Sequence, residues 1–511
     1  MNGAESLVHT LLASGVDTCF ANPGTSEMHF VAALDRIPGM RCVLGLFEGV
    51  VTGAADGYAR VAERPAATLL HCGPGLANGL ANLHNARRAN SPIVNIVGDQ
   101  ATHHRPLDAP LTADTEGWAR PVSGWTRTAM HAADVGADAA AAVQAARSAP
   151  GQVATLVLPS DTSWDEGGIV AQALPVPPPT QVDQGIVDAI ARVLRRGEPT
   201  LLLLGGDVLR AGPLAVAGGI LAATGARMLA QTSNARIERG AGRTPIDRVP
   251  YPVDMALKAL AGLKHLVLVG AVPPVGFFAY PGKPGRMYPD DCTVHVLSRP
   301  EQDGPAALAS LAEALGARAA AAPSIARPEV ARGAITSESM AQTLAALMPD
   351  NAIVVDESVS FGRGLFPITE GAAPHDWLQI TGGAIGCGLP ISTGAAVAAP
   401  GRRVVTLQAD GSAMYTVQAL WTQARERLDV TTVILANRKY AILLGELANV
   451  GANPGRTALD MMDLGNPDLD WCKISQGLGV DAARADSMEM FADLLAHANR
   501  RSGPFLIELV I

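Results

Sequence analysis

The sequence predicts an α/β fold built from three consecutive doubly wound, parallel-sheet domains. At 511 residues the chain is too long for one hydrophobic core. Short apolar runs alternate with amphipathic stretches along its length, which is the pattern of strands joined by crossover helices. Two proline-containing linkers, 173–181 and 316–330, interrupt this pattern. We therefore expect domains at residues 1–172, 181–320 and 335–511.

Eight short apolar runs are predicted to be the strands of these sheets. They occupy 41–47, 66–71 and 92–98 in the first third, 200–206 and 265–271 in the middle third, and 352–358, 404–410 and 430–437 in the last. The longest uncharged apolar stretch, 211–226, is rich in glycine. It is shorter than the roughly 20 apolar residues that a membrane span needs. We expect a buried helix there and no membrane segment.

The composition argues against several classes of partner and site. The net charge is −9, from 39 Lys and Arg against 48 Asp and Glu, and no basic run is present. Nucleic acid is therefore not an expected partner. The six cysteines are scattered without a CxxC pair, which predicts neither a disulfide scaffold nor a zinc site. The N-terminal segment contains Glu5 and no early Lys or Arg, so no signal peptide is expected and a cytoplasmic location is predicted.

Two predicted strands of the last third end on oxygen-bearing side chains, Asp410 and Asn437. In a right-handed strand–helix–strand unit, both parallel strands end at the sheet edge where open α/β folds bind ligands. A carboxylate and an amide oxygen suit Mg²⁺ or Ca²⁺. Gly411 and Ser412 then begin a helix, whose free N–H groups favour an anion. The set predicts a diphosphate bridged by Mg²⁺; the alternative is that Ser412 only caps a helix and Asp410 only forms a turn.

A second candidate site contains an isolated acid. Glu48 follows the apolar run 41–47 and begins a predicted helix, so we expect it to be desolvated and functional. The alternative is a glutamate placed there by the helix dipole. A third element, 382–390, holds four glycines whose order does not match GxGxxG. These glycines let a backbone approach a flat ligand, with Ile385 either a wedge against it or part of the core.

Together these segments resemble the thiamine diphosphate (ThDP) enzymes of the pyruvate decarboxylase, acetolactate synthase and benzoylformate decarboxylase group. The matching motifs lie in order along nearly the whole chain, at 22–27, 46–59, 70–86, 356–360, 382–390, 409–412 and 436–437. The resemblance implies an N-terminal domain that binds the aminopyrimidine ring, a central α/β domain, and a C-terminal domain that binds diphosphate and Mg²⁺. It is more specific for the superfamily than for the reaction.

The resemblance also assigns residues around the diphosphate. It implies Mg²⁺ ligation by Asp410, by the Asn437 side chain and by the backbone carbonyl of Lys439. It implies diphosphate contacts from Ser360, Gly411, Ser412 and Tyr440. The first residue of each usual family motif, GDG and NN, is alanine in this chain, and the ligating residues are retained.

Three residues are implied around the reacting end of the cofactor. Glu48 matches the glutamate that hydrogen-bonds the aminopyrimidine ring and promotes its imino form. Ile385 matches the wedge that bends the cofactor, and the carbonyl of Gly383 would receive its 4′-amino group. The resemblance implies a ylid that attacks a 2-oxo acid and an enamine formed when CO₂ leaves. It also implies that the two halves of each site come from different subunits, so that a homodimer is the minimum and a homotetramer is expected.

Decarboxylation of a 2-oxo acid, as in benzoylformate decarboxylase, is the predicted reaction. His71 aligns with an active-site histidine of that relative, and Thr25 or the adjacent Ser26 with its substrate-contacting serine. The alternative for His71 is a histidine that simply follows a strand. The second catalytic histidine of that relative falls near Phe277 and Phe278, where this chain has no histidine.

Other features depart from the pyruvate decarboxylases. Those enzymes carry a glutamate at about Leu443, whereas Glu446 lies three residues later. His103 and His104 are similar to their histidine pair but lie at a different position, so a solvated loop pair is favoured.

Three alternatives to this reaction follow. An apolar pocket with few acids suits an acetolactate synthase-type carboligase, which joins the enamine to a second carbonyl. The short middle domain shows no phosphate-binding glycine motif in 181–316, so FAD is not predicted. A nucleotide-binding oxidoreductase is disfavoured because the sequence lacks the GxGxxG fingerprint of that class. A non-catalytic regulatory paralogue is disfavoured because Glu48 and Asp410 are both present.

Overall fold

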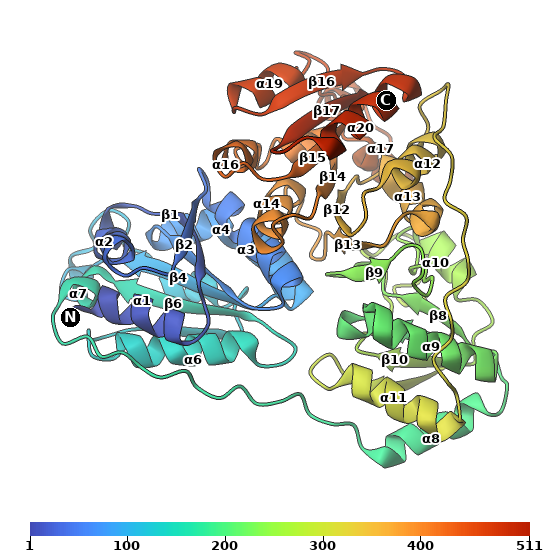
Figure 1. Ribbon diagram of the computed structural model, residues 1–511, viewed down its shortest axis with the longest axis horizontal. Coiled ribbons are helices and arrows are strands. Elements are labelled where there is room, and N and C mark those ends of the chain that lie inside the picture. The colour runs from blue at the N-terminus through green and yellow to red at the C-terminus, as the bar shows by residue number, and fades with distance from the viewer.

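The computed structural model describes residues 1–511 and contains three α/β units, seen as the blue, green and red parts of Figure 1. The N-terminal unit has a six-stranded sheet of order β2-β1-β3-β4-β6-β5 in which every pair is parallel. Its strands are β1 Thr18–Asn22, β2 Arg41–Leu44, β3 Ala66–Leu70, β4 Ile93–Asp99, β5 Trp125–Thr128 and β6 Val153–Pro159. Its helices are α1 Gly3–Ala13, α2 Met28–Arg36, α3 Glu48–Ala62, α4 Cys72–Ala89, α5 Thr115–Ala119, α6 Val135–Arg147 and α7 Ser160–Trp164.

The middle unit has a smaller, four-stranded parallel sheet of order β11-β10-β7-β8. A long connection without helices or strands leads to it from the N-terminal unit (Figure 1). Its strands are β7 Thr200–Leu204, β8 Arg227–Ala230, β10 His265–Val269 and β11 Thr293–Ser298. Its helices are α8 Gln184–Leu194, α9 Ala211–Thr224, α10 Val253–Ala259 and α11 Gly304–Leu315.

The C-terminal unit has a seven-stranded sheet of order β16-β17-β15-β14-β12-β13-β9. Its strands are β12 Ala352–Glu357, β13 His375–Gln379, β14 Val404–Ala409, β15 Val430–Ala436, β16 Asp481–Ala485 and β17 Phe505–Val510. The longer helices are α12 Ser337–Leu347, α14 Gly388–Ala398, α17 Ala441–Asn449 and α20 Met488–Arg500. The shorter ones are α13 Leu365–Ile368, α15 Asp410–Ala413, α16 Ala419–Arg425, α18 Arg456–Asp460 and α19 Trp471–Gly477.

All eight predicted strands are confirmed, and two details differ from expectation. Strand β9, Ile237–Arg239, lies in the middle third of the sequence but pairs antiparallel with β13 of the third sheet. The third sheet is therefore mixed, with one antiparallel edge strand, as is common in α/β sheets. Helix α9 forms where a buried helix was predicted, but only Leu214, Ala217, Gly219 and Ile220 are buried. One side of α9 therefore stays partly open to solvent.

Close helix packing joins the N-terminal and C-terminal units. Helices α3 and α14 lie against each other at the centre of the molecule (Figure 1). A Cβ atom at Gly57 would lie 2.1 Å from the carbonyl oxygen of Ile391, and one at Gly394 would lie 1.8 Å from that of Ala54. Only glycine fits at such distances, so these residues let the two backbones touch. This contact fixes the relative position of the two sheets that carry the predicted site residues.

Candidate active site

Asp410 and Asn437 lie at the same edge of the third sheet. Strands β14 and β15 are neighbouring and parallel, and each ends directly before one of these residues. Asp410 Oδ2 accepts the backbone N–H of Arg438 at 2.6 Å, and Asn437 Oδ1 accepts that of Lys439 at 3.0 Å. The two strand ends are therefore linked, and both side-chain oxygens keep lone pairs for a cation.

Asp410 is almost fully buried, with 3% of its surface exposed. Burial raises the pKa of this carboxyl group, although the N–H groups of Arg438 and Gly411 oppose the shift. A cation beside the carboxylate would offset the cost of burying its charge. The helix expected after Asp410 is only α15, four residues long. Its dipole is therefore small, and free N–H groups rather than a long helix remain available for an anion.

The other predicted diphosphate residues surround this edge. Ser360 follows β12, the neighbour of β14, and directly precedes a short 3₁₀ turn without a side-chain capping hydrogen bond. Gln408 Nε2 donates to the Ser412 hydroxyl at 2.6 Å, which fixes that side chain. A Cβ atom at Gly411 would lie 2.4 Å from the Tyr440 ring. The absence of a side chain at residue 411 thus lets Tyr440 lie against the backbone after β14.

The loop that carries Gly383 and Ile385 is held from two sides. Glu357, at the end of β12, accepts the backbone N–H groups of Gly386 and Gly388. From the N-terminal unit, Asn85 Nδ2 donates to the carbonyl of Ala384 at 2.7 Å. Gly383 has a φ of +81°, a conformation that favours glycine, and Ile385 is half-buried. Sequence reasoning did not assign Glu357 a role, although it ends a predicted strand and lies in the motif 356–360.

Glu48 lies at the carboxyl edge of the first sheet. It is the first residue of α3, shortly after β2, and only 8% of its surface is exposed, so the predicted burial is confirmed. Asn78 Nδ2, on α4, donates to Glu48 Oε2 at 3.0 Å. A Cβ atom at Gly75 would lie 2.8 Å from Glu48 Oε1. The first turn of α4 is therefore shaped around this carboxyl group.

His71 lies at the same edge, directly after β3, and pairs with a buried acid. Its Nδ1 is 2.9 Å from Oε2 of Glu27, whose side chain is fully buried, whereas 24% of the His71 side chain is exposed. The Ser26 hydroxyl lies 3.3 Å from the same nitrogen and 3.1 Å from Sγ of Cys72. Burial raises the pKa of the Cys72 thiol to about 11, so this sulfur stays protonated. Thr25 begins the short turn that carries Ser26.

The histidine is thus more than a residue that follows a strand. Because Glu27 engages Nδ1, the imidazole is held in one orientation and Nε2 stays available for a ligand. Glu27 and Cys72 were not among the predicted site residues. Their signals were weak, since Glu27 and Cys72 lie in the motifs 22–27 and 70–86 but no role for either residue followed from the resemblance. Their contacts with Ser26 and His71 join segments far apart in the sequence.

The predicted residues therefore form two groups within one chain. Glu48, His71, Thr25 and Ser26 gather at the edge of the first sheet, and the remaining ones gather at the edge of the third. The N-terminal unit touches the second group at the loop 382–385, through Asn85 and through His84, which contacts the carbonyl of Gly382 at 3.2 Å. It also packs beside the metal-site strands, where Val50 of α3 shares a buried cluster with Ala413 and Ala436. Each group is assembled by its own sheet.

The residues that depart from the pyruvate decarboxylase pattern lie elsewhere. Glu446 lies with Tyr280 of the middle unit in the lining of one small hollow, so this acid stands where α17 meets that unit. His103 is 72% exposed and lies 3.6 Å from Asp161. His103 therefore belongs to a solvated loop, as favoured from the sequence.

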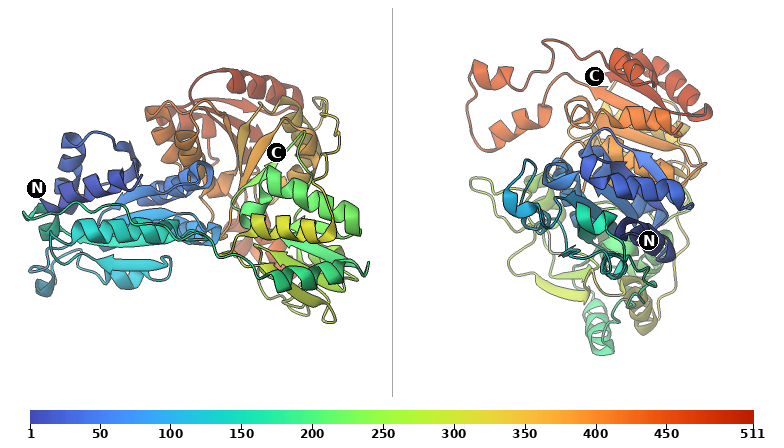
Figure 2. Two further views of the ribbon diagram at one scale, coloured as in Figure 1. Left: turned by 60° about the horizontal axis from the view of Figure 1, so that its bottom comes forward. Right: turned by 90° about the vertical axis from the view of Figure 1, so that its left-hand side faces the viewer.

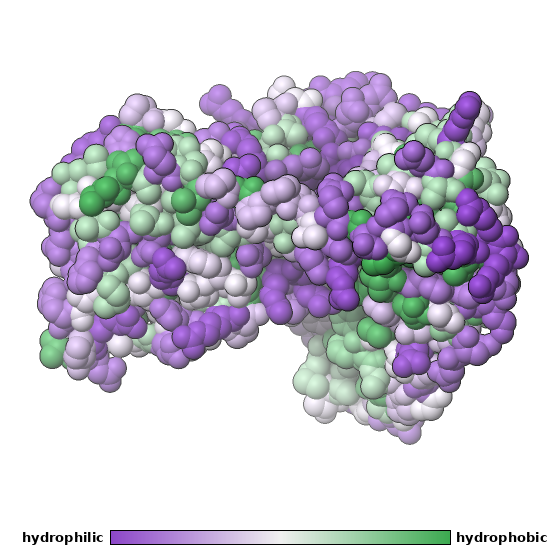
Figure 3. Space-filling view, turned by 90° about the horizontal axis from the view of Figure 1, so that it is seen from below, coloured by the Kyte–Doolittle hydropathy of each residue, from purple (hydrophilic) through white to green (hydrophobic).

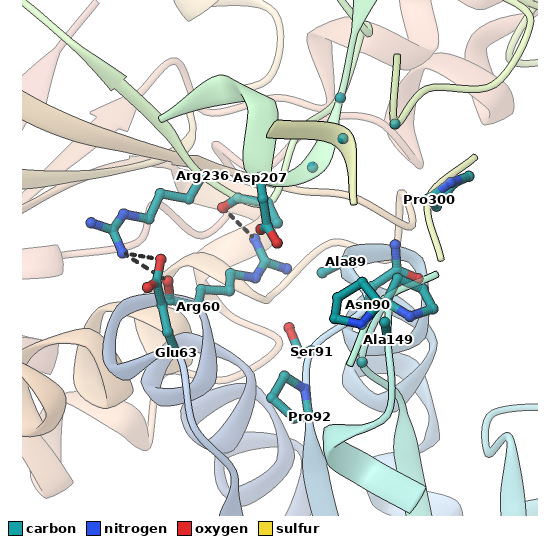
Figure 4. A pocket seen from close by; sticks show the side chains of 18 of the residues that line it. Arg60, Glu63, Ala89, Asn90, Ser91, Pro92, Ala149, Asp207, Arg236 and Pro300 are labelled. Atoms are coloured by element: carbon teal, nitrogen blue, oxygen red, sulfur yellow. Dashed lines mark hydrogen bonds and ion pairs between the residues drawn. The ribbon is translucent and has the colours of Figure 1, made fainter. Parts of the chain in front are cut away.

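A cavity of about 620 Å³ lies away from both groups, between the N-terminal and middle units. Figure 4 shows Glu63 facing Arg236 across it, at 3.2 Å, and Glu63 also pairs with Arg210 at 3.1 Å. Arg60 pairs with Asp56 at 2.6 Å. Figure 3 shows that hydrophilic residues dominate the surface where the left-hand and right-hand lobes meet. The ion pairs of Glu63 with Arg210 and Arg236 join the N-terminal and middle units beside this cavity, whereas Arg60 pairs within its own helix. Because all three arginines have carboxylate partners, we read the cavity as part of the contact between the units.

Comparison with known proteins agrees with this arrangement of two sheet edges. Residues 1–119 match the N-terminal TPP-binding domain of the thiamine pyrophosphate enzymes, and residues 366–509 match the C-terminal TPP-binding domain. A Mycobacterium tuberculosis protein named as a putative acetolactate synthase large subunit, IlvX, is 53% identical over 100% of this chain and 99% of its own length. The chain belongs to the thiamine pyrophosphate enzymes. The resemblance stated from the motifs is confirmed.

Further members of this thiamine pyrophosphate enzyme family are similar over the whole chain. Benzoylformate decarboxylase of Pseudomonas aeruginosa is 30% identical over 97% of this chain and 96% of its own. The solved structure of the Rhodococcus jostii RHA1 thiamine diphosphate-dependent 4-hydroxybenzoylformate decarboxylase superposes with a TM-score of 0.81 at 25% identity, covering 99% and 98% of the two chains. The three-unit α/β fold is thus the thiamine pyrophosphate enzyme fold.

The donor set at the third sheet fits a hard cation and a diphosphate. It offers a carboxylate, an amide oxygen and backbone carbonyls, which are ligands of Mg²⁺ rather than of a soft metal. The buried Gln408 Oε1 has no hydrogen-bond partner, which leaves an acceptor beside Ser412.

No helix of the structure combines the length and the apolar character that crossing a bilayer requires.

Proposed function

We propose that the protein is a ThDP- and Mg²⁺-dependent 2-oxo acid decarboxylase of the benzoylformate decarboxylase type. The observation that carries this proposal is the buried Glu27–His71 pair at the same sheet edge as Glu48. A decarboxylase must deliver a proton after CO₂ leaves, and an oriented imidazole is suited to that step. Similarity to two decarboxylases over nearly the whole chain supports the same assignment.

In this proposal the third sheet holds the diphosphate end of the cofactor. Asp410, Asn437 and the carbonyl of Lys439 bind Mg²⁺, and the diphosphate contacts Ser360, Gly411, Ser412 and Tyr440. When bound, ThDP supplies an electron sink for the cleavage of the bond to CO₂. The carbonyl of Gly383 would accept the 4′-amino group of ThDP and Ile385 would pack against the cofactor, since both residues stand on the loop that Glu357 and Asn85 hold.

The first sheet supplies the groups that move protons. Glu48 is buried and held by Asn78, so its carboxyl group is placed to exchange a proton with the aminopyrimidine ring. His71 Nε2 delivers a proton to the reacting carbon, while Glu27 stabilises the charged imidazole. Ser26, or Thr25 beside it, contacts the substrate carboxylate. In this scheme Glu27 is a positioning residue because it acts through His71.

An acetolactate synthase-type carboligase is the second candidate. The 53% identical relative carries the acetolactate synthase name, and this chain has Phe277 and Phe278 where a second histidine would supply a proton. Slow protonation leaves time for a second carbonyl to react. A non-catalytic paralogue is disfavoured because the proposed acid, base and metal residues are all retained.

We also propose that the active unit contains two chains. The two cofactor-binding domains of the family are separate segments of this chain, residues 1–119 and 366–509, and the resemblance implies that Glu48 of one chain serves the metal site of another. A homodimer is then the minimum and a homotetramer is expected. A cytoplasmic location is proposed because all six cysteines are free.

The test is a product analysis of the purified protein with ThDP and Mg²⁺. Benzoylformate and pyruvate are supplied separately, with CO₂ release measured and products identified by NMR. Aldehyde as the main product supports the decarboxylase. Acetolactate or another acyloin as the main product supports the carboligase instead. The absence of turnover despite tight ThDP binding contradicts both candidates.

A further inference from the structure

The middle unit places three aromatic rings beside the proposed cofactor site. Tyr251, Phe277 and Phe278, here called the aromatic wall, are in contact in series. The ring centroids of Tyr251 and Phe277 are 5.4 Å apart, and those of Phe277 and Phe278 are 4.9 Å apart in an edge-to-face arrangement. These separations are those of favourable aromatic pairs. The rings therefore form one continuous apolar surface.

The aromatic wall touches the loop of the third unit that carries the cofactor contacts. A Cβ atom at Gly383 would lie only 2.5 Å from Cζ of Phe277. The positive φ of Gly383 and this close ring both require glycine at the position. Gly383 is also the residue whose carbonyl is proposed to receive the 4′-amino group. Phe277 thus lies beside the reacting end of the cofactor rather than beside its diphosphate.

The segment that bears Phe277 and Phe278 is fixed at several points. Gly276 donates its N–H to the carbonyl of Gly285 at 2.8 Å, which closes the segment into a loop. Lys283 pairs with Asp254 on α10 at 2.7 Å. Tyr280 lines one small hollow together with Glu446 of α17. The loop is therefore tied to both the middle and the C-terminal units, and the wall has a defined position.

The rings remain open on one side. Phe277 is 49% exposed and Phe278 is 60% exposed, although each could bury a large apolar area. Clustered exposed aromatic residues commonly mark a ligand-binding surface. The two phenylalanines have no proton to donate or accept, so the wall selects a ligand by apolar contact and shape.

We propose that the aromatic wall receives the aryl group of a 2-oxo acid substrate. This inference rests on the proposed function and names the substrate class for that site. A flat aryl group gains ring contacts with Phe277 and Phe278, whereas the methyl group of pyruvate reaches little of either ring. The substrate carboxylate then faces the Ser26 and His71 edge that the second subunit supplies in the proposed dimer, which is polar where the wall is apolar.

The experiment compares Phe277→Leu and Phe278→Leu with the wild-type holoenzyme, with Trp164→Leu as the control. Trp164 is an exposed aromatic residue of the N-terminal unit, 41% exposed and outside the proposed site. Two readouts are measured. One is the ratio of kcat/KM for benzoylformate to that for pyruvate. The other is calorimetric binding of mandelate and lactate, the unreactive 2-hydroxy analogues of these two acids.

Wild-type holoenzyme is expected to bind mandelate more tightly than lactate. Each wall variant should lower both the kcat/KM ratio and mandelate affinity by about five-fold or more, with lactate binding and the Trp164→Leu control nearly unchanged. Equal affinity for the two analogues, or unchanged preference in both variants, overturns the inference. Dissociation of the oligomer in the variants also overturns it, because the wall would then be covered by a second subunit.

The two proposals fail in different ways. If neither 2-oxo acid is turned over, the proposed function fails, and the binding of mandelate still tests the wall. If both acids are turned over with no wall-dependent preference, the function stands and the wall inference fails.

Discussion

At the scale of single residues, the buried carboxyl groups carry most of the proposed chemistry. Glu48, Glu27, Glu357 and Asp410 are each at most 8% exposed, and each is held by N–H groups or by a histidine. Burying an unpaired carboxylate is costly, so these contacts fix where each group lies. Two of the four, Glu48 and Asp410, were expected from the sequence because they follow directly after apolar runs. The other two owe their role to contacts that a single segment does not reveal.

Glu48→Gln separates proton transfer from binding. Glutamine keeps the size of the side chain and a hydrogen-bonding partner for Asn78, but it cannot exchange the proton. Turnover should fall about 100-fold or more, while Mg²⁺-dependent ThDP binding changes little. Steady-state CO₂ release and calorimetry provide the two readouts. Glu63→Gln, at the exposed end of the same helix, serves as the control; full activity in Glu48→Gln would remove this residue from the mechanism.

At the scale of elements, the loop after β13 depends on the acid that ends β12. Glu357→Ala removes the acceptor of two backbone N–H groups at once and leaves a small void. The loop bearing Gly383 and Ile385 should then lose its fixed position, which we expect to weaken ThDP affinity about ten-fold or more. Calorimetric titration at saturating Mg²⁺ measures this change. Glu338→Ala, on the exposed face of α12, is the control, and equal affinities in both variants would contradict the role of Glu357.

A buried histidine on strand β13, His375, should make the stability of the fold depend on pH. Burial, and then the charge of Arg239, lowers the pKa of His375 to about 3, and its Nε2 has no partner. At this position the folded state binds fewer protons than the unfolded state. The contribution of neutral His375 to the free energy of unfolding is therefore complete above about pH 6.5 and is lost as pH falls toward 3. The free energy of unfolding should decrease by about 1.4 kcal/mol per pH unit in that window from this group. Urea unfolding between pH 7 and 5 measures the slope, which should be shallower in His375→Gln; identical slopes would contradict the argument.

The sequence was sufficient for the elements with strong local signals and insufficient for contacts between distant segments. All eight apolar runs became strands, and seven of them are buried on both faces, as continuous Val, Ile and Leu predict; β2 is the exception, with Arg41 and Cys42 exposed. Strand β9 has three residues and no such signal, and its partner β13 lies over 130 residues away. The Glu27–His71 pair and the contact of Phe277 with Gly383 likewise depend on how whole units pack. Such contacts appear only in the folded chain.

At the scale of the whole molecule, the packing of α3 against α14 sets how the two groups of proposed site residues lie relative to each other. The glycine-mediated contact between α3 and α14 holds the first and third sheets in one fixed relation. Helices α17 and α18, which follow the proposed metal ligands, have no buried residue, and Figure 2 (right) shows the orange helices extending from the C-terminal unit. A chain with an exposed segment beside its proposed metal site is suited to receive a second subunit there.

Subunit complementation tests this arrangement. Glu48→Gln and Asp410→Ala each disable every site of a homodimer. In a mixed dimer, one site receives both altered residues and the other receives neither, because each site takes Glu48 from one chain and Asp410 from its partner. Unfolding and refolding an equal mixture yields about half mixed dimers, so about a quarter of wild-type activity should return. CO₂ release before and after mixing measures it. Activity that stays near zero, in mixtures shown by mass spectrometry to contain mixed dimers, would place both residues of each site in a single chain.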